Sequence, residues 1–163
     1  MSAAIAHRAR ARRALGRLLD TDDDYVALGL RLVLALVLFP HGAQHLFGWF
    51  GGYGYAGTHG WMVGTVGIPG PIATFAIVVE VLAPLALIVG AFGRVAAAGL
   101  AGFLLVAAST HLGHGFFMNW LGNQQGEGFE YHILALALAM AVAVRGSGAC
   151  SLDARLTRAR RRQ

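Results

Sequence analysis

Four apolar runs, each close to the length needed to cross a bilayer, constrain the fold of this chain more than any other feature. They cover residues 25–47, 71–91, 95–112 and 130–144. A hydrophobic stretch of about 18 residues or more is typical of a transmembrane helix, and the short fourth run can cross if Arg145 extends its side chain to the headgroups. Charged residues make up only 13% of the sequence, against about 25% in a typical soluble domain. The sequence therefore predicts an all-α protein, a four-transmembrane-helix bundle in a lipid bilayer.

The arginines predict how this bundle is oriented. The 13 basic residues are all arginine, and most lie in two terminal clusters at residues 8–17 and 155–162. Because basic residues collect in cytoplasmic segments, we expect a multi-pass protein of the cell membrane with both termini cytoplasmic. The clusters have no interleaved aromatic residues for base stacking, so nucleic acid is not an expected partner. The chain is expected to divide into an arginine-rich segment at 1–24, a membrane domain at 25–146 and an arginine-rich tail at 147–163. Within these parts we expect a surface helix over 1–19 and two outer segments at 51–70 and 115–128.

The single cysteine, Cys150, follows the last apolar run on the expected cytoplasmic side. One thiol in a reducing compartment cannot form an intramolecular disulfide relay, which argues against a thiol–disulfide enzyme that works alone. The first apolar run follows acidic residues and is too long for a signal-peptide core, so we expect no cleavable signal peptide.

A histidine-rich block at the end of the first apolar run is the first candidate site. His41, Gln44 and His45 are spaced i, i+3 and i+4, so they share one face of a helix. Pro40 removes the backbone hydrogen bond to the carbonyl of Leu36 and tends to kink the helix. Polar side chains in an apolar setting are costly unless they have partners, so we expect partners on the other helices.

The other three runs supply candidate partners at similar depths. Glu80 lies near the middle of the second run, and Pro84 leaves the backbone carbonyl of Glu80 without its helical hydrogen bond. His111 and His114 share a face at the end of the third run, and Glu130 begins the fourth. Ionisable residues in membrane spans usually face the interior of the bundle, so these groups are expected to share one cavity near the outer face.

Simpler alternatives exist for each of these residues. A histidine at the outer boundary could be a solvated interface residue, Glu80 a protonated acid bonded to a neighbouring helix, and Glu130 an acid at a helix start. Arg31, in the first turns of its span, could snorkel to the inner headgroups or pair with an acid. His132 is about 200° around the helix from Glu130, so both cannot face inward, and we expect His132 to point away from the cavity.

In this order along the chain, these residues resemble the DoxX/DoxD family of small four-helix membrane proteins. The resemblance covers about residues 29–153. It rests on Arg31, the His41-Gly-x-Gln44 block, Gly67-x-Pro69, Glu80, the Gly90-x2-Gly93-Arg94 turn, the outer histidine of the third span, Glu130-Tyr131 and the closing Gly146-x-Gly148-x2-Ser151-Leu152-Asp153. The family often has lysine at the position of His45, so a permanent positive charge is not expected there. The resemblance implies membrane redox chemistry, because DoxD-like members act in thiosulfate:quinone oxidoreductase and DoxX-like members associate with thiol and oxidative-stress systems.

Three functions from different classes fit these observations. The leading hypothesis is a quinone-linked oxidoreductase, or a subunit of one, in which Glu80 and Glu130 are the catalytic proton carriers. The candidate cofactor-binding residues are His41, Gln44, His45, His111, His114 and Arg31, and the candidate transition-metal ligands are His41, His45 and His111. Haem is less favoured than a quinone or a metal, because nothing fixes which histidine pair would bind it. The alternatives are a scaffold that recruits soluble redox enzymes through its arginine-rich tails and a small proton-coupled transporter, which would need a homo-oligomer.

Overall fold

The computed structural model of this 163-residue chain describes residues 5–7, 10, 16 and 18–162. Within these residues the regular elements are all helices, and no strand is present. The predicted surface helix over residues 1–19 lies largely outside the described residues. The elements are α2 (Tyr25–Phe47), η1 (Trp49–Gly51), α3 (Gly54–Gly64), α4 (Gly70–Val89), α5 (Gly93–His111), η2 (Leu112–His114), α6 (Glu130–Arg145) and α7 (Leu152–Arg161).

The described residues contain three helices that are long and apolar enough to cross a membrane. These are α2, α4 and the continuous stretch of α5 and η2, Gly93–His114. With 16 residues, α6 is shorter than any of them, and at 1.5 Å per residue it covers about 24 Å of a hydrocarbon core that is about 30 Å thick. The prediction of an all-helical protein is therefore confirmed, whereas the fourth crossing and the side on which the termini lie stay predictions.

The ends of the long helices follow from local chemistry that the sequence displays. The carboxylate of Asp24 caps α2 by accepting the N–H groups of Val26 at 2.8 Å and Ala27 at 3.1 Å. Gly48 ends α2 in the left-handed conformation at a φ of 74°, which glycine adopts without steric cost. The observed bounds of α2 match its predicted span, and those of α4, α5 and α6 differ from their own predicted spans by at most two residues at either end.

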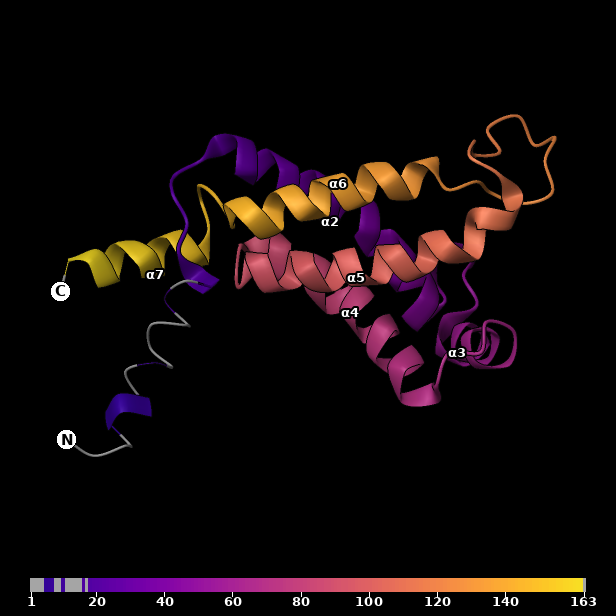
Figure 1. The fold of residues 1–163 in the computed structure, drawn as a ribbon, viewed down its shortest axis with the longest axis horizontal. Helices are drawn as coiled ribbons and strands as arrows, with labels where there is room; N and C mark the ends of the chain where they lie inside the picture. The colour runs from indigo at the N-terminus through magenta and orange to yellow at the C-terminus, as the bar shows by residue number, and fades with distance from the viewer. Residues whose placement is uncertain (1–4, 8–9, 11–15, 17, 163) are drawn as a thin grey trace.

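The four longest helices share one apolar core. Helix α2 packs along α4 and also contacts α6, while α5 packs against both α6 and α4 (Figure 1). Core members from each helix include Leu34, Leu38, Leu87, Leu100, Leu104, Ala135 and Ala139. The outward faces remain apolar, since Leu36 is 74% exposed and Leu134 is 68% exposed. In a bilayer such faces contact lipid chains, and the helices satisfy their own backbone groups.

Helices α2 and α4 come closest where the candidate site lies. A Cβ atom on Gly42 would collide with the backbone carbonyl of Glu80, so only glycine fits at this crossing. Pro84 is inside α4, four residues after Glu80, and leaves that carbonyl without its helical partner. The close backbone contact between α2 and α4 therefore fixes Glu80 beside the histidine face of α2.

Arg31 lies apart from the other predicted cofactor-binding residues that line the cavity, so its predicted place among them is corrected. Its side chain is buried, with 1% exposed, and it does not line the cavity described below. The guanidinium donates to the carbonyls of Leu87 and Ile88 at the end of α4 and of Ser147, Ala149 and Cys150 in the loop before α7. Arginine has five N–H donors in a rigid fork, which suits several carbonyls at once. Arg31 therefore neither snorkels nor pairs with an acid, and it ties three segments together at the end of the bundle remote from the cavity.

Asp153 completes this network around Arg31. Its carboxylate accepts the backbone N–H groups of Phe92 at 2.9 Å and Gly93 at 3.0 Å, and the hydroxyl of Ser147 at 2.6 Å. These amides begin α5, so the carboxylate caps that helix. The glycine turn and the closing motif that carried the family resemblance are therefore explained by packing at this end of the bundle.

Two helices were not predicted from the sequence. Helix α3 lies in the expected outer segment, and its Met62 packs against Ala73 and Ile77 of α4. Helix α7 forms within the arginine-rich tail and extends from the bundle at the end opposite α3 (Figure 1). Arg158 of α7 forms an ion pair with Asp23, so part of the arginine-rich tail folds back onto the acidic residues before α2.

Candidate functional site

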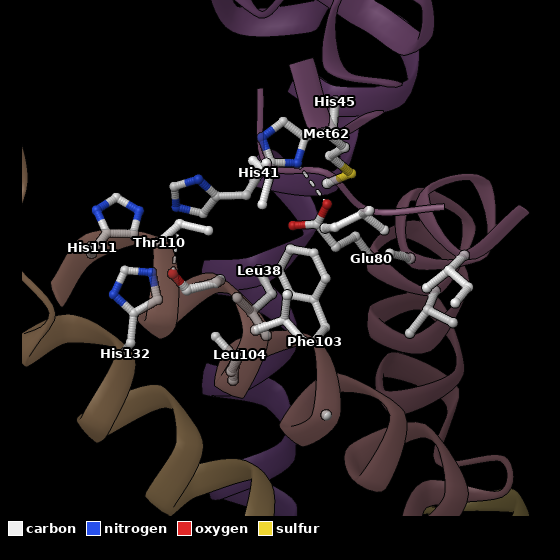
Figure 2. Close-up of a pocket in the computed structure, with 18 of the residues that line it drawn as sticks. Leu38, His41, His45, Met62, Glu80, Phe103, Leu104, Thr110, His111 and His132 are labelled. Atoms are coloured by element: carbon white, nitrogen blue, oxygen red, sulfur yellow. Dashed lines mark hydrogen bonds and ion pairs between the residues drawn. The ribbon is translucent and has the colours of Figure 1, made fainter. Parts of the chain in front are cut away.

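A cavity of about 800 Å³ lies among α2, α4, α5 and α6. Helix α3 contributes Trp61 and Met62 to its wall, and the loop 115–129 contributes Met118 and Glu127. Figure 2 shows that the polar side chains gather at one end. The polar lining residues are His41, His45, Glu80, Thr110, His111, Glu127, Tyr131 and His132.

The shortest polar contact in the cavity joins α2 to α4. His45 Nδ1 lies 2.6 Å from Glu80 Oε2, and the side chain of Glu80 is only 2% exposed. A buried carboxylate is costly unless it is paired, so this hydrogen bond explains how the acid is tolerated inside an apolar helix. Figure 2 shows the second carboxylate oxygen turned from His45 toward the side of the cavity where His41 lies. The pair can hold one proton between the two residues and still present an oxygen to a ligand.

The opposite wall of the cavity is formed by the ends of α5 and α6. The rings of His111 and His132 lie 4.6 Å apart between centroids. Nδ1 of His111 is 2.8 Å from the backbone carbonyl of Glu127. A carbonyl oxygen only accepts, so this nitrogen of His111 carries a proton and the other ring nitrogen faces elsewhere. The loop 115–129 thereby fixes the orientation of His111.

His132 lines the cavity, which corrects the prediction that it points away. It is 8% exposed, and it lies beside His111 in Figure 2. Glu130 and His132 do not both face inward, as helix geometry requires, but Glu130 is the one that turns away. Glu130 turns outward to the loop, where its Oε1 accepts the N–H of Met118 at 3.0 Å and the indole N–H of Trp120 at 2.9 Å.

Two further predicted site residues do not line the cavity. Gln44 donates from Nε2 to the carbonyl of Phe50 at 3.3 Å, which stabilises the turn after α2. His114 lies in η2, and its ring packs against Gly126, where a Cβ atom would collide with it. The structure therefore brings together His41, His45, Glu80 and His111, and leaves Gln44, Glu130 and His114 outside the cavity lining.

The predicted metal ligands do not form a metal site in this arrangement. Among the described residues, no group of three or more His, Cys, Asp and Glu side chains is placed to hold a metal ion. His45 uses Nδ1 for Glu80, while His111 uses Nδ1 for the backbone of Glu127. Each of these histidines is therefore already engaged by the protein on one side of its ring.

The rest of the cavity is apolar and reaches the flank of the bundle between α4 and α5. Ile72 and Phe75 of α4 line it, and they are 56% and 67% exposed. Val106 of α5 also lines it and is 49% exposed. Figure 1 shows α4 diverging from α5 toward the N-terminal end of α4. The cavity thus combines a polar end with an apolar side that opens where a bilayer would meet the protein.

A comparison with protein families matches residues 26–120 to DoxX. The chain belongs to the DoxX family. The resemblance inferred from the sequence is confirmed, and the family together with the three apolar helices indicates a multi-pass membrane protein. The matched range of this DoxX-family chain includes His41, Glu80 and His111 but ends before α6, which supplies Tyr131 and His132. Neither the curated proteins nor the solved structures contain a match.

Proposed function

We propose that this DoxX-family protein binds a quinone in the cavity and acts as a subunit of a quinone-linked oxidoreductase. In this proposal α6 is the fourth span, both termini are cytoplasmic, and the cavity lies near the outer face of the cell membrane. The arginine distribution supports that orientation, since Arg94 and the basic residues of α7 all lie at the end of the bundle remote from the cavity.

One observation carries the proposal: the His45–Glu80 pair lies at the polar end of a cavity whose remainder is lined mostly by apolar side chains. A membrane quinone has a polar ring and a long apolar chain, so it needs a binding site with one polar end and an apolar remainder. The opening between α4 and α5 faces the region from which a lipid-soluble ligand arrives. Binding sites for small ligands are commonly apolar, with a few polar groups that fix orientation.

The chain's own residues account for one of the two proton transfers in quinone chemistry. Reduction of a quinone to a hydroquinone adds two electrons and two protons, and oxidation removes them. The His45–Glu80 pair, which bridges α2 and α4, can deliver or accept one of these protons without a change of fold, and water supplies or takes up the other. In this proposal a soluble redox partner exchanges the electrons. Glu130 is not assigned a proton-carrying role, because its carboxylate is engaged by Met118 and Trp120.

The test compares Glu80→Gln with Glu130→Gln in protein reconstituted into lipid nanodiscs. Both variants replace a carboxyl by an amide of the same size, but only Glu80 lines the cavity. We expect the wild type to bind decyl-para-benzoquinone saturably. We expect Glu80→Gln to reduce quinone-dependent turnover by about 100-fold or more, as loss of a general acid–base group does. Glu130→Gln should retain turnover. A wild type that binds no quinone, or equal activity in both variants, would refute the proposal.

A scaffold role is the second candidate, and the exposed arginine-rich helix α7 favours it. Arg155 and Arg160 are exposed on this helix, beside the exposed side chains of Leu152 and Leu156. The double variant Arg155→Gln/Arg160→Gln separates the two roles. Loss of function with normal quinone binding would indicate recruitment of a partner through α7, whereas unchanged function would leave the cavity as the functional part.

A further inference from the structure

Two buried polar atoms of the cavity wall have no hydrogen-bond partner among the described residues. They are the hydroxyl of Tyr131 and Nδ1 of His132. The great majority of buried polar atoms in proteins do have a partner, and each exception calls for an explanation such as an ordered water or a ligand. The cost of an unpartnered group is highest in apolar surroundings, which is the setting of this bundle.

Both atoms belong to the same wall of the cavity. Tyr131 and His132 are consecutive in the first turn of α6, and both side chains line the cavity. The rings of Tyr131 and His41 are 6.0 Å apart between centroids, and those of His132 and His111 are 4.6 Å apart. In Figure 2, His132 and His111 lie across the cavity from Glu80, with His41 between the two sides.

The two sides of the cavity differ in how their polar groups are satisfied. On the α2–α4 side, His45 and Glu80 bond to each other. On the α5–α6 side, His111 bonds to the backbone of Glu127, but Tyr131 and His132 are left without a protein partner. A tyrosine hydroxyl donates or accepts, and a neutral imidazole nitrogen does either according to its tautomer. One ligand oxygen, as a carbonyl or a hydroxyl, can therefore satisfy either atom.

We propose that Tyr131 and His132 form a second hydrogen-bonding pole that makes the cavity selective for rings with oxygens at opposite ends. One oxygen is held at the Glu80 pole and the other at the Tyr131–His132 pole. The proposal rests on the proposed quinone function and adds the residues that recognise the far oxygen. It also extends the ligand-binding residues into α6, beyond the range that matches the family.

The experiment measures the affinities of two probes in lipid nanodiscs by quenching of tryptophan fluorescence, since Trp61 lines the cavity. Decyl-para-benzoquinone has oxygens at both ends of its ring, whereas meta-decylphenol has one ring oxygen and can bind at the Glu80 pole alone. The variants are Tyr131→Phe and His132→Phe. Their matched controls are Tyr53→Phe and His114→Phe, which change the same residue types outside the cavity.

We expect Tyr131→Phe and His132→Phe each to weaken quinone binding by about fivefold to tenfold, the usual effect of one lost hydrogen bond. Binding of meta-decylphenol should stay within about twofold of wild type, because that ligand needs only the other pole. Thermal stability of Tyr131→Phe without ligand should be equal to or higher than that of wild type, because an unpartnered hydroxyl has been removed. The control variants should change neither affinity.

Three results would overturn this inference. If both probes are weakened equally, the two residues shape the cavity but do not recognise a second oxygen. If neither probe is affected, or if Tyr131→Phe loses stability, the two atoms serve an internal water or the fold. If the wild type binds neither probe, the proposed quinone function fails as well, and that result is distinct from the other two.

Discussion

Replacement of Arg31 by methionine tests the account of the end of the bundle remote from the cavity. Arg31 is 1% exposed and donates to five backbone carbonyls from the end of α4 and the loop before α7. Methionine keeps much of the side-chain volume but donates no hydrogen bond. Each buried carbonyl left without a donor costs about 1–3 kcal/mol, although removal of the buried guanidinium and entry of water recover part of that sum.

We therefore expect Arg31→Met to lower the free energy of unfolding by about 3–5 kcal/mol, as the net effect of five carbonyls that lose their donor. For a chain of this length that corresponds to a fall in Tm of roughly 10 °C. The assay is thermal unfolding in mild detergent, followed by far-ultraviolet circular dichroism. Arg158→Met is the matched control, because Arg158 pairs with Asp23 on the surface, where the two side chains are 48% and 58% exposed. Such an exposed pair contributes about 1 kcal/mol or less.

A second measurement separates a structural role from a ligand-binding one. Arg31 does not line the cavity, so folded Arg31→Met at low temperature should bind decyl-para-benzoquinone as well as wild type. The reasoning is refuted if Arg31→Met and Arg158→Met lose similar stability. It is also refuted if Arg31→Met keeps its stability but loses quinone binding, since that result would restore the cofactor role predicted from the sequence.

Three further substitutions test contacts near the site and at the opposite end. Gly42→Ala places a Cβ against the Glu80 carbonyl. The resulting overpacking should destabilise the fold by about 1–3 kcal/mol, and an unchanged Tm would contradict the close α2–α4 crossing. His45→Leu leaves the buried carboxyl of Glu80 without its partner and should lower the free energy of unfolding by about 3 kcal/mol. The double variant His45→Leu/Glu80→Leu should regain much of that stability, and no gain would argue against the pair. Asp153→Ala removes the cap of α5 and should cost about 1–2 kcal/mol in chemical denaturation, and a neutral result would show that the cap is dispensable.

The helical core could be predicted because its signals are local. The apolar runs, the Asp24 cap and the Gly48 terminus lie within α2 or beside it, so they fix that helix without knowledge of its neighbours. Helix α3 gave no such signal, because its sequence is rich in glycine and it gains its stability from the packing of Met62 on α4. Helix α7 could not be predicted from the arginine pattern, because clustered arginines indicate membrane topology whether or not they are helical.

The candidate site was also predictable in part, where its signals were local to one helix. Helical spacing and proline placement indicated His41 and Glu80 as candidates, and both line the cavity. The partners of Arg31 are backbone carbonyls, which no residue pattern reveals, so its role could not be deduced from the sequence. For Glu130 and His132, helix periodicity gave their relative directions, but only the folded loop decided which of them faces the cavity.

The most direct test of the account is whether a side chain placed in the cavity displaces the ligand. Gly102 of α5 lines the cavity, and a Cβ there would meet no atom within 4 Å. Gly29 of α2 is also free of neighbours within 4 Å but does not line the cavity, so Gly29→Phe is the matched control for Gly102→Phe. Saturable binding of decyl-para-benzoquinone should be retained in Gly29→Phe and abolished in Gly102→Phe. Equal binding by the two variants, or none by the wild type, would contradict the claim that this cavity holds a quinone.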